Sequence, residues 1–266
     1  MDKIVTVVRK EWAEVFKNKL VLFSVLFLPL ILAIMPLGML FAFSRAAATP
    51  GMEAELSDPE IMQFAGAMCA DLSAGDCTLV YTLNLFVLMF MILPVAIPVT
   101  IAAYSIVGEK TTRSLEPLLA TPITTVELLA AKAIAAVGPA ILATWLAFAI
   151  FLVGARLLTT PTVFNEFFSA QWLIAILVVA PLLTLLATSA AVIVSSRVSD
   201  PRVAEQLASV VILPLVLLVI GQAVGFILID QQVMVILGVA VLLLDVLLIY
   251  LAVRLFQRET ILTRWK

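Results

Sequence analysis

The 266-residue chain contains no histidine, and this absence excludes several kinds of catalytic site. Serine-histidine hydrolases, HExxH metalloproteases and most zinc centres all require an imidazole. A phosphate-binding Walker pattern is missing as well, because Gly108-Glu-Lys-Thr lacks a second glycine immediately before its lysine. We therefore predict a chain that is not an enzyme and that holds no metal and no cofactor of its own.

Charged residues are also scarce: they make up 13% of the chain, whereas 64% is hydrophobic and the mean hydropathy is +1.19. Soluble domains do not have this composition, so the chain is predicted to be an integral membrane protein. Apolar runs cover residues 20–43, 81–107, 133–155, 171–196, 207–229 and 233–253. Each run is long enough for a helix to cross about 30 Å of hydrocarbon. The predicted fold is all-α, with residues 1–266 forming a single domain of six transmembrane helices.

Positive charge lies almost entirely on one side of these spans. All lysines and arginines except Arg45 and Arg156 lie before residue 20, after residue 253, or in the connections 108–132 and 197–206. Because cytoplasmic loops are enriched in lysine and arginine, we predict a multi-pass plasma-membrane protein with both termini in the cytoplasm. The sequence offers no basic patch for nucleic acid, so its expected surroundings are membrane lipids and other proteins.

The first nineteen residues have the pattern of an amphipathic helix. Their apolar positions recur at spacings of three and four: Ile4, Val8, Trp12, Val15 and Phe16. Their charged positions fill the remaining arc: Lys3, Arg9, Lys10, Glu11, Glu14, Lys17 and Lys19. Such a helix is expected to lie at the membrane interface. It serves either as an anchor alone or also as one wall of a docking surface for a cytoplasmic partner.

Residues 44–80 form the one sizeable loop predicted outside the cell, and it is strongly acidic. We interpret the acidic residues as a solvated surface, although a funnel for cations is an alternative. Both cysteines of the chain, Cys69 and Cys77, fall in this loop. An oxidising exterior would allow them to form a disulfide, and two reduced thiols are the alternative.

Asp245 is the one ionisable residue deep within a span, so it should face the bundle, water or a partner rather than lipid. Asn84, Gln222 and Tyr104 are the polar residues within spans that could meet it. Its role is either a contact for a proton, a cation or a cationic substrate, or a structural hydrogen bond at a helix or subunit interface. Prolines in five spans, including Pro94, Pro181 and Pro214, predict helix kinks.

Residues 108–132 form a polar connection between the second and third spans, on the predicted cytoplasmic side. Pro117 suits the first turn of a short helix that presents Leu118 and Leu119, and Thr121-Pro122 ends it. Thr124 and Glu127 then form the pattern of a capping box that begins the helix of the third span. An apolar pair among charged residues suits insertion into a groove of another protein, and the alternative is an interfacial loop without a partner.

The motifs Ser105-Ile-Val-Gly-Glu109, Ser114-Leu-Glu-Pro-Leu-Leu-Ala-Thr-Pro122 and Glu127-Leu-Leu-Ala-Ala-Lys132 together resemble the cytoplasmic signature of type-2 ABC transporter permeases. The branch that they resemble most includes the sodium-extrusion and drug-exporter permeases. This resemblance implies a permease dimer, of like or unlike chains, docked on two ATPase subunits that bind ATP and Mg²⁺. It also implies that residues 115–120 form a coupling helix inserted into the ATPase. The residues expected to contact the ATPase are Glu109, Arg113, Leu115, Glu116, Leu118, Leu119 and Pro122.

Two features depart from relatives of this family. The outer loop after the first span is short beside the folded extracellular domain of many relatives. The connection at Asp230 leaves little room for re-entrant helices between the last two spans. The predicted function is therefore export of a drug, lipid, peptide or ion by an ABC permease subunit, and the alternative is an ion- or proton-coupled secondary transporter that uses Asp245.

Overall fold

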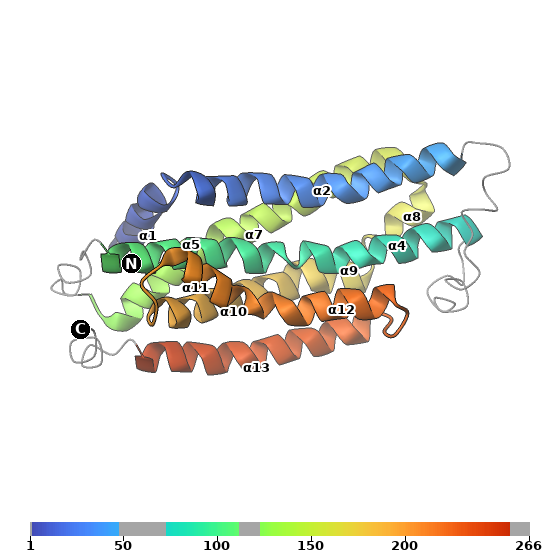
Figure 1. Cartoon of the computed structure of the whole chain (residues 1–266). Coiled ribbons are helices and arrows are strands. Elements are labelled where there is room, and N and C mark those ends of the chain that lie inside the picture. The colour runs from blue at the N-terminus through green and yellow to red at the C-terminus, as the bar shows by residue number, and fades with distance from the viewer. Residues whose placement is uncertain (1, 48–72, 112–122, 256–266) are drawn as a thin grey trace.

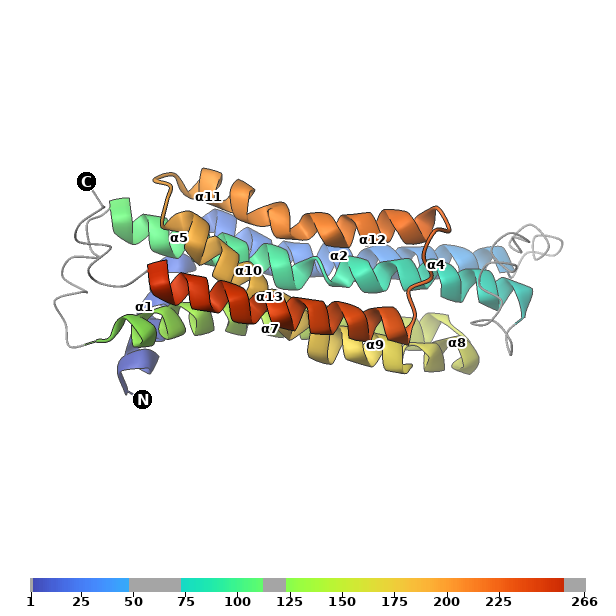
Figure 2. The same ribbon diagram turned by 90° about the horizontal axis from the view of Figure 1, so that it is seen from below.

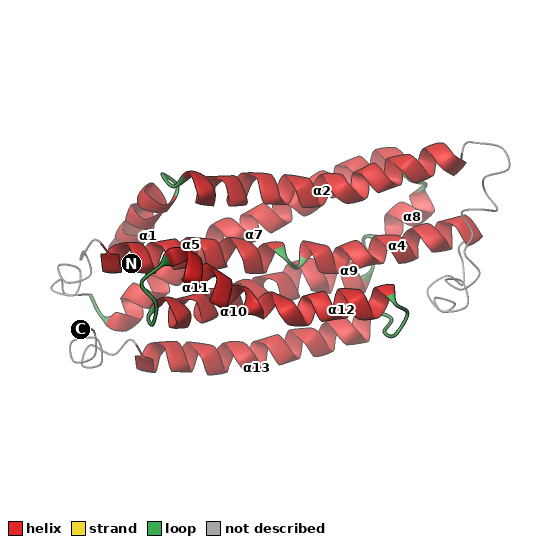
Figure 3. Ribbon diagram, in the orientation of Figure 1, coloured by secondary structure: helices red, strands yellow, loops and turns green. Residues whose placement is uncertain are grey.

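The structure, a computed structural model, describes residues 2–47, 73–111 and 123–255. Every regular element within these ranges is helical, and Figure 3 shows helices joined by short loops. The elements are α1 (Asp2–Val15), α2 (Lys19–Ala47), α4 (Ala74–Phe90), α5 (Leu93–Thr111), α7 (Thr125–Leu158), α8 (Pro161–Glu166), α9 (Ala170–Ile174), the π-helical η1 (Ala175–Val179), α10 (Ala180–Ser195), α11 (Pro201–Ala208), the 3₁₀-helical η2 (Ser209–Ile212), α12 (Leu213–Ala223) and α13 (Gln231–Leu255). The predicted all-α class is confirmed.

Six helical stretches within the described ranges are long and apolar enough to cross a membrane, as predicted. They are Val21–Ala46, Gly75–Gly108, Val126–Leu158, Ala170–Ser195, Pro201–Ala223 and Gln231–Leu255. Figures 1 and 2 show these stretches running along one common direction, with α1 at one end of the bundle and α8 at the other. We call these the α1 end and the α8 end.

The span built from α4 and α5 occupies the centre of the bundle. Within its most apolar stretch 78% of the residues are buried, compared with 22% for α2 and for α13. The central span contacts α2, α7, α10, α11 and α12, whereas α2 and α13 leave most of their apolar side chains on the surface. The outer helices therefore offer the surface that lipid or another membrane subunit would cover.

Small residues let the helices of this bundle approach closely. Fully buried alanines lie on two of them: Ala136, Ala140 and Ala147 on α7, and Ala187 and Ala191 on α10. Gly154 of α7 shows the tightest approach, because a Cβ placed there would lie 2.5 Å from Cδ2 of Leu37 on α2. Within a bilayer, where lipid is as apolar as leucine, such close packing is a main source of helix association.

Prolines shape three of the six spans, and each leaves a different irregularity. The central span breaks at Met91 and Ile92, whose N–H groups bond three residues back, and Pro94 then falls in the first turn of α5. Before Pro181 the chain forms the π-helical η1, in which the Ala180 N–H bonds the Ala175 carbonyl. Before Pro214 it forms the 3₁₀-helical η2. Each irregularity accommodates a ring that cannot donate to the helix ladder.

Several helix ends differ from the predicted ranges for local reasons. The second span starts at Ala74 instead of residue 81, because Ser73 caps it by accepting from the Asp76 N–H. The fifth span ends at Ala223 instead of residue 229, since Gly225 adopts a positive φ of 77° and Phe226 turns back to bond the Gly221 carbonyl. Hydropathy predicts the length of an apolar run, but it contains no information on the caps and turns that set where a helix begins and ends.

The close contact at Gly154 yields a stability prediction. Gly154→Ala should lower the apparent melting temperature of the purified protein, because the new methyl group forces Leu37 to move, at a cost of about 1–3 kcal/mol. Gly38→Ala on α2 is the matched control, since no atom lies within 4 Å of its added Cβ. Adding Leu37→Ala to Gly154→Ala should relieve the clash. Equal effects of the two glycine substitutions would contradict this account of the α2–α7 contact.

Candidate functional site

The N-terminal helix α1 packs across the start of α7 by one buried stripe. Val7, Glu11 and Val15 are buried at a spacing of four, which places them on one face of the helix. Val7 packs against Ile123 and the first turns of α7, in a small apolar cluster with Leu128 and Ala131. The helix predicted from the sequence therefore docks on the bundle through a face that includes an acidic residue.

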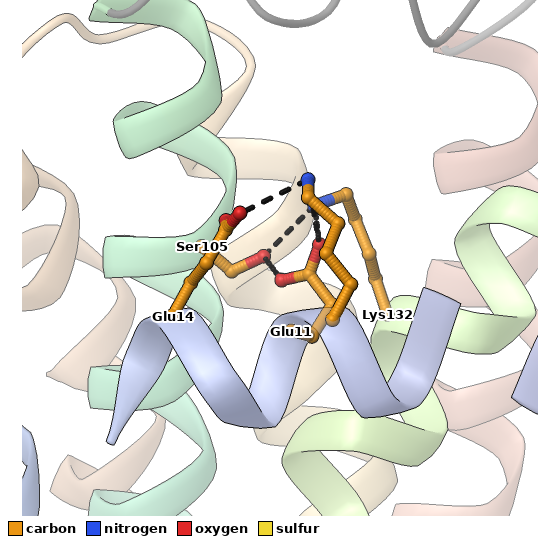
Figure 4. A network of polar contacts seen from close by, with 5 residues as sticks. Glu11, Glu14, Ser105 and Lys132 are labelled. Atoms are coloured by element: carbon orange, nitrogen blue, oxygen red, sulfur yellow. Dashed lines mark hydrogen bonds and ion pairs between the residues drawn. The ribbon is translucent and has the colours of Figure 1, made fainter. Parts of the chain in front are cut away.

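Glu11 forms a buried polar network with residues of two other helices (Figure 4). Its Oε1 atom accepts a hydrogen bond from Nζ of Lys132 on α7 at 2.8 Å, and its Oε2 atom accepts from the hydroxyl of Ser105 on α5. Lys132 Nζ also donates to Ser105 Oγ at 2.9 Å. Glu11 is only 2% exposed and Lys132 only 6%. We call Glu11, Ser105 and Lys132 the α1 clamp.

Because the charged groups of the α1 clamp are buried, each of them must be paired. Removing a carboxylate and an ammonium group from water costs several kcal/mol for each ion, and only close contact with good hydrogen bonds offsets this cost. The hydroxyl of Ser105 contributes one such bond to each ion. The three side chains therefore hold α1, α5 and α7 in one arrangement, because loss of the Glu11–Lys132 contact separates two buried charges and loss of Ser105 removes a hydrogen bond from each of them.

Further contacts support α1 around the clamp. The Trp12 indole N–H donates to the Ala135 carbonyl of α7 at 2.9 Å. On the outer side of the helix, Lys10 lies 3.6 Å from Glu14 in an ion pair one turn apart. That pair is partly exposed, and such pairs contribute little to stability. The buried contacts, rather than this one, fix the position of α1.

The predicted coupling segment lies between two of the clamped helices. Glu109 belongs to α5, whereas Arg113, Leu115, Glu116, Leu118, Leu119 and Pro122 lie outside the described residues. Beyond this segment the predicted capping box is present: the Thr124 hydroxyl and the Glu127 carboxylate each bond the other's backbone N–H and begin α7. Ser105 thus precedes the connection 108–132 and Lys132 is its last residue, so the α1 clamp ties together α5 and α7, the helices on both sides of residues 112–122.

Sequence analysis did not identify the clamp as a unit. The sequence pattern places Glu11 on the polar arc of an amphipathic helix, and it places Ser105 and Lys132 in motifs of the cytoplasmic signature, with nothing to connect the three. The spacing does indicate that Glu11 lies on an apolar face of the helix, because it falls four residues after Val7 and four before Val15. The partner could not be read from the sequence, because 121 positions separate Glu11 from Lys132.

A second polar contact joins the fifth span to the central one near the α1 end. Oγ1 of Thr100 on α5 donates to Oε1 of Glu205 on α11 at 2.6 Å. Asp200 caps α11 by accepting from the Arg202 N–H at 2.7 Å. The central helix α5 is therefore held by acidic side chains from both α1 and α11.

The polar residues predicted to meet Asp245 do not do so. Asn84 of α4 accepts a 2.9 Å hydrogen bond from the Trp172 indole, and the side-chain nitrogen and oxygen of Gln222 have no hydrogen-bond partner among the described residues. The Gln222 backbone carbonyl accepts from the Tyr81 hydroxyl at 2.7 Å. Asp245 is 2% exposed on α13, and neither carboxyl oxygen has a described partner. Its role as a contact for a ligand or a subunit stays a prediction.

The predicted disulfide concerns the start of the central span. Cys77 is fully buried in the first turn of α4 and is not a free thiol. Cys69 lies outside the described residues. The pairing of Cys69 with Cys77 stays a prediction.

The clamp predicts different effects on stability for single and double substitutions. Glu11→Leu or Lys132→Met should each lower stability by about 3 kcal/mol, because the remaining buried charge loses its partner. The double variant Glu11→Leu/Lys132→Met should recover most of this loss. Thermal unfolding and the rate of proteolysis within residues 3–19 would measure both effects.

Glu14→Gln is the control for this series, since Glu14 pairs only with Lys10 at a partly exposed position. It should leave both readouts nearly unchanged. Additive losses in the double variant would contradict a coupled buried pair.

Comparison with known proteins places the whole bundle in one family. A search of curated proteins finds no match to the chain. A family model described as ABC-2 family transporter protein matches residues 5–259, from within α1 to beyond the end of α13. The match spans nearly the full chain, including the clamp and the predicted coupling segment. The chain therefore belongs to the ABC-2 family of transporter proteins.

Proposed function

We propose that this chain is the permease subunit of an ABC exporter and that a separate ATPase drives it from the cytoplasm. The α1 clamp carries this proposal, because it unites the helices on both sides of residues 112–122 with α1. A displacement of that segment is passed to both α5 and α7, since Ser105 of α5 bonds both members of the buried Glu11–Lys132 ion pair. α5 belongs to the most buried span, so the displacement reaches the centre of the bundle.

In this proposal residues 115–120 insert into a cleft of the ATPase, with Leu118 and Leu119 as the apolar contact. ATP and Mg²⁺ bind to the ATPase, and the chain itself performs no chemistry. Two ATPase subunits serve two permease chains, which are alike or different. The weakly buried helices α2, α12 and α13 supply surface for the second permease chain as well as for lipid.

The burial of Asp245 favours a second candidate function, that of a secondary transporter. Asp245 has no described hydrogen-bond partner although it is buried in a span. A carboxyl group placed in that way can bind a proton, a cation or a cationic substrate. It would be the ion site of a secondary transporter, or a substrate contact within the exporter.

The coupling proposal predicts the behaviour of a double variant. Leu118→Asp/Leu119→Asp should abolish co-purification of the ATPase while the chain still inserts into the membrane, because two charges cannot enter an apolar cleft. Leu118→Met/Leu119→Met keeps the apolar character and is the matched control. A pull-down from solubilised membranes measures the association. Retention of the ATPase by the charged variant would refute a coupling role for these leucines.

A further prediction concerns Asp245. If a ligand or a subunit uses this carboxyl group, Asp245→Asn should lower the ATP turnover of the reconstituted complex about tenfold, as for the loss of a contact worth about 1.4 kcal/mol. Thr188→Val is the control, since the buried Thr188 hydroxyl only bonds the Thr184 carbonyl of its own helix. Unchanged turnover in Asp245→Asn would remove the residue from the mechanism. Asp245-dependent cation uptake by the chain alone, without an ATPase, would instead support the secondary transporter.

A further inference from the structure

A groove of about 480 Å³ lies between α1 and the start of α7, beside the face that carries the α1 clamp. It is lined by Ile4, Val5, Val8, Arg9, Trp12 and Ile134. The size is within the range of ligand pockets in proteins, which also combine an apolar lining with a few polar groups. Arg9 supplies the only charged group in this lining.

The groove lies beside the start of the third membrane-crossing stretch. Ile134 is 49% exposed and belongs to the membrane-crossing stretch Val126–Leu158, only two residues beyond Lys132 of the clamp. Trp12 is 40% exposed, and its indole N–H is already bonded to the Ala135 carbonyl, so its ring is left for apolar contacts. Tryptophan in this situation is typical of the depth at which headgroups and acyl chains meet.

The charge of the groove favours an anionic occupant. Arg9 is exposed and has no ion-pair or hydrogen-bond partner among the described residues. The acidic residues Glu11 and Glu14 do not offset it, because Glu11 is paired with Lys132 and Glu14 with Lys10. A guanidinium group beside an apolar groove can bind a phosphate group while the groove holds the acyl chain that is joined to it.

We propose that this groove binds one anionic glycerophospholipid of the surrounding bilayer. Its acyl chain lies along Val8, Trp12 and Ile134, and its phosphate contacts Arg9. A zwitterionic phospholipid would bring the same chain and phosphate but also a cation close to Arg9, so it binds less tightly. The lipid contacts α1 and α7 at once and so holds α1 in the position that the clamp requires. This binding depends on neither an ATPase nor a transported substrate.

Native mass spectrometry of the purified full chain, titrated with phosphatidylglycerol or phosphatidylcholine, tests the proposal. The wild type should retain one phosphatidylglycerol molecule in preference to phosphatidylcholine. Arg9→Gln should lower the affinity for phosphatidylglycerol about fivefold, as expected for the loss of one basic residue near a membrane surface. Arg202→Gln is the matched control, because Arg202 is an exposed arginine on α11 that does not line the groove.

A second measurement follows Trp12 in nanodiscs, so it does not depend on how the arginine variants fold. The fluorescence of Trp12, taken as the difference between the wild type and Trp12→Phe, should be quenched more by brominated phosphatidylglycerol than by brominated phosphatidylcholine. Absence of quenching by either lipid would mean that protein, such as a second copy of the chain, covers the groove, and it would overturn the proposal. Equal quenching by both lipids, with no effect of Arg9→Gln, would show only unselective annular lipid and would overturn it as well.

Discussion

The buried ion pair between Glu11 and Lys132 is the constraint on which the arrangement of the α1 end depends. Neither charge can remain in the protein interior alone, because each would lose its hydration without compensation. α1 must therefore dock wherever Lys132 is placed by α7, and Ser105 brings α5 into the same arrangement. A helix that hydropathy would leave loosely on the membrane surface becomes part of the bundle. The ion pair specifies position more than it adds stability.

Close packing of small residues holds much of the rest of the bundle, together with a few hydrogen bonds between helices, such as the one from Thr100 to Glu205. Alanines along α7 and α10 allow close approach, and Gly154 leaves only enough room for Leu37. Burial of apolar side chains is not favoured over contact with lipid inside a bilayer, so tight packing must supply the attraction. The central span gains most from it, and the weakly buried spans that contain α2, α12 and α13 gain least. Helices that are less tightly held are the ones able to exchange neighbours.

The sequence was sufficient for the number of spans because bilayer thickness sets a minimum apolar length, and each apolar run meets it. It was also sufficient for the capping box at Thr124 and Glu127, a local pattern whose two partners lie three residues apart. Local chemistry explains the differences at Ala74 and Ala223, where a serine cap and a glycine turn set the helix ends. The clamp was missed for another reason. Its three residues meet only after α1, α5 and α7 have packed, and no local pattern carries that information.

Glu11 and Asp245 are both 2% exposed, yet their surroundings differ in a way that separates structural from functional burial. Glu11 has both carboxylate oxygens bonded within the chain, and its neighbours fix it in one position. Asp245 has neither oxygen bonded to a described residue, so the described part of the chain supplies no hydrogen bond to its carboxyl group. A polar group that is fully satisfied favours a single arrangement of the helices. One that is unsatisfied favours whatever arrangement brings it a partner. Under the proposed function, the first carboxylate would keep the helices of the α1 end together, and the second would be the group within a span that is left to meet a ligand or a subunit.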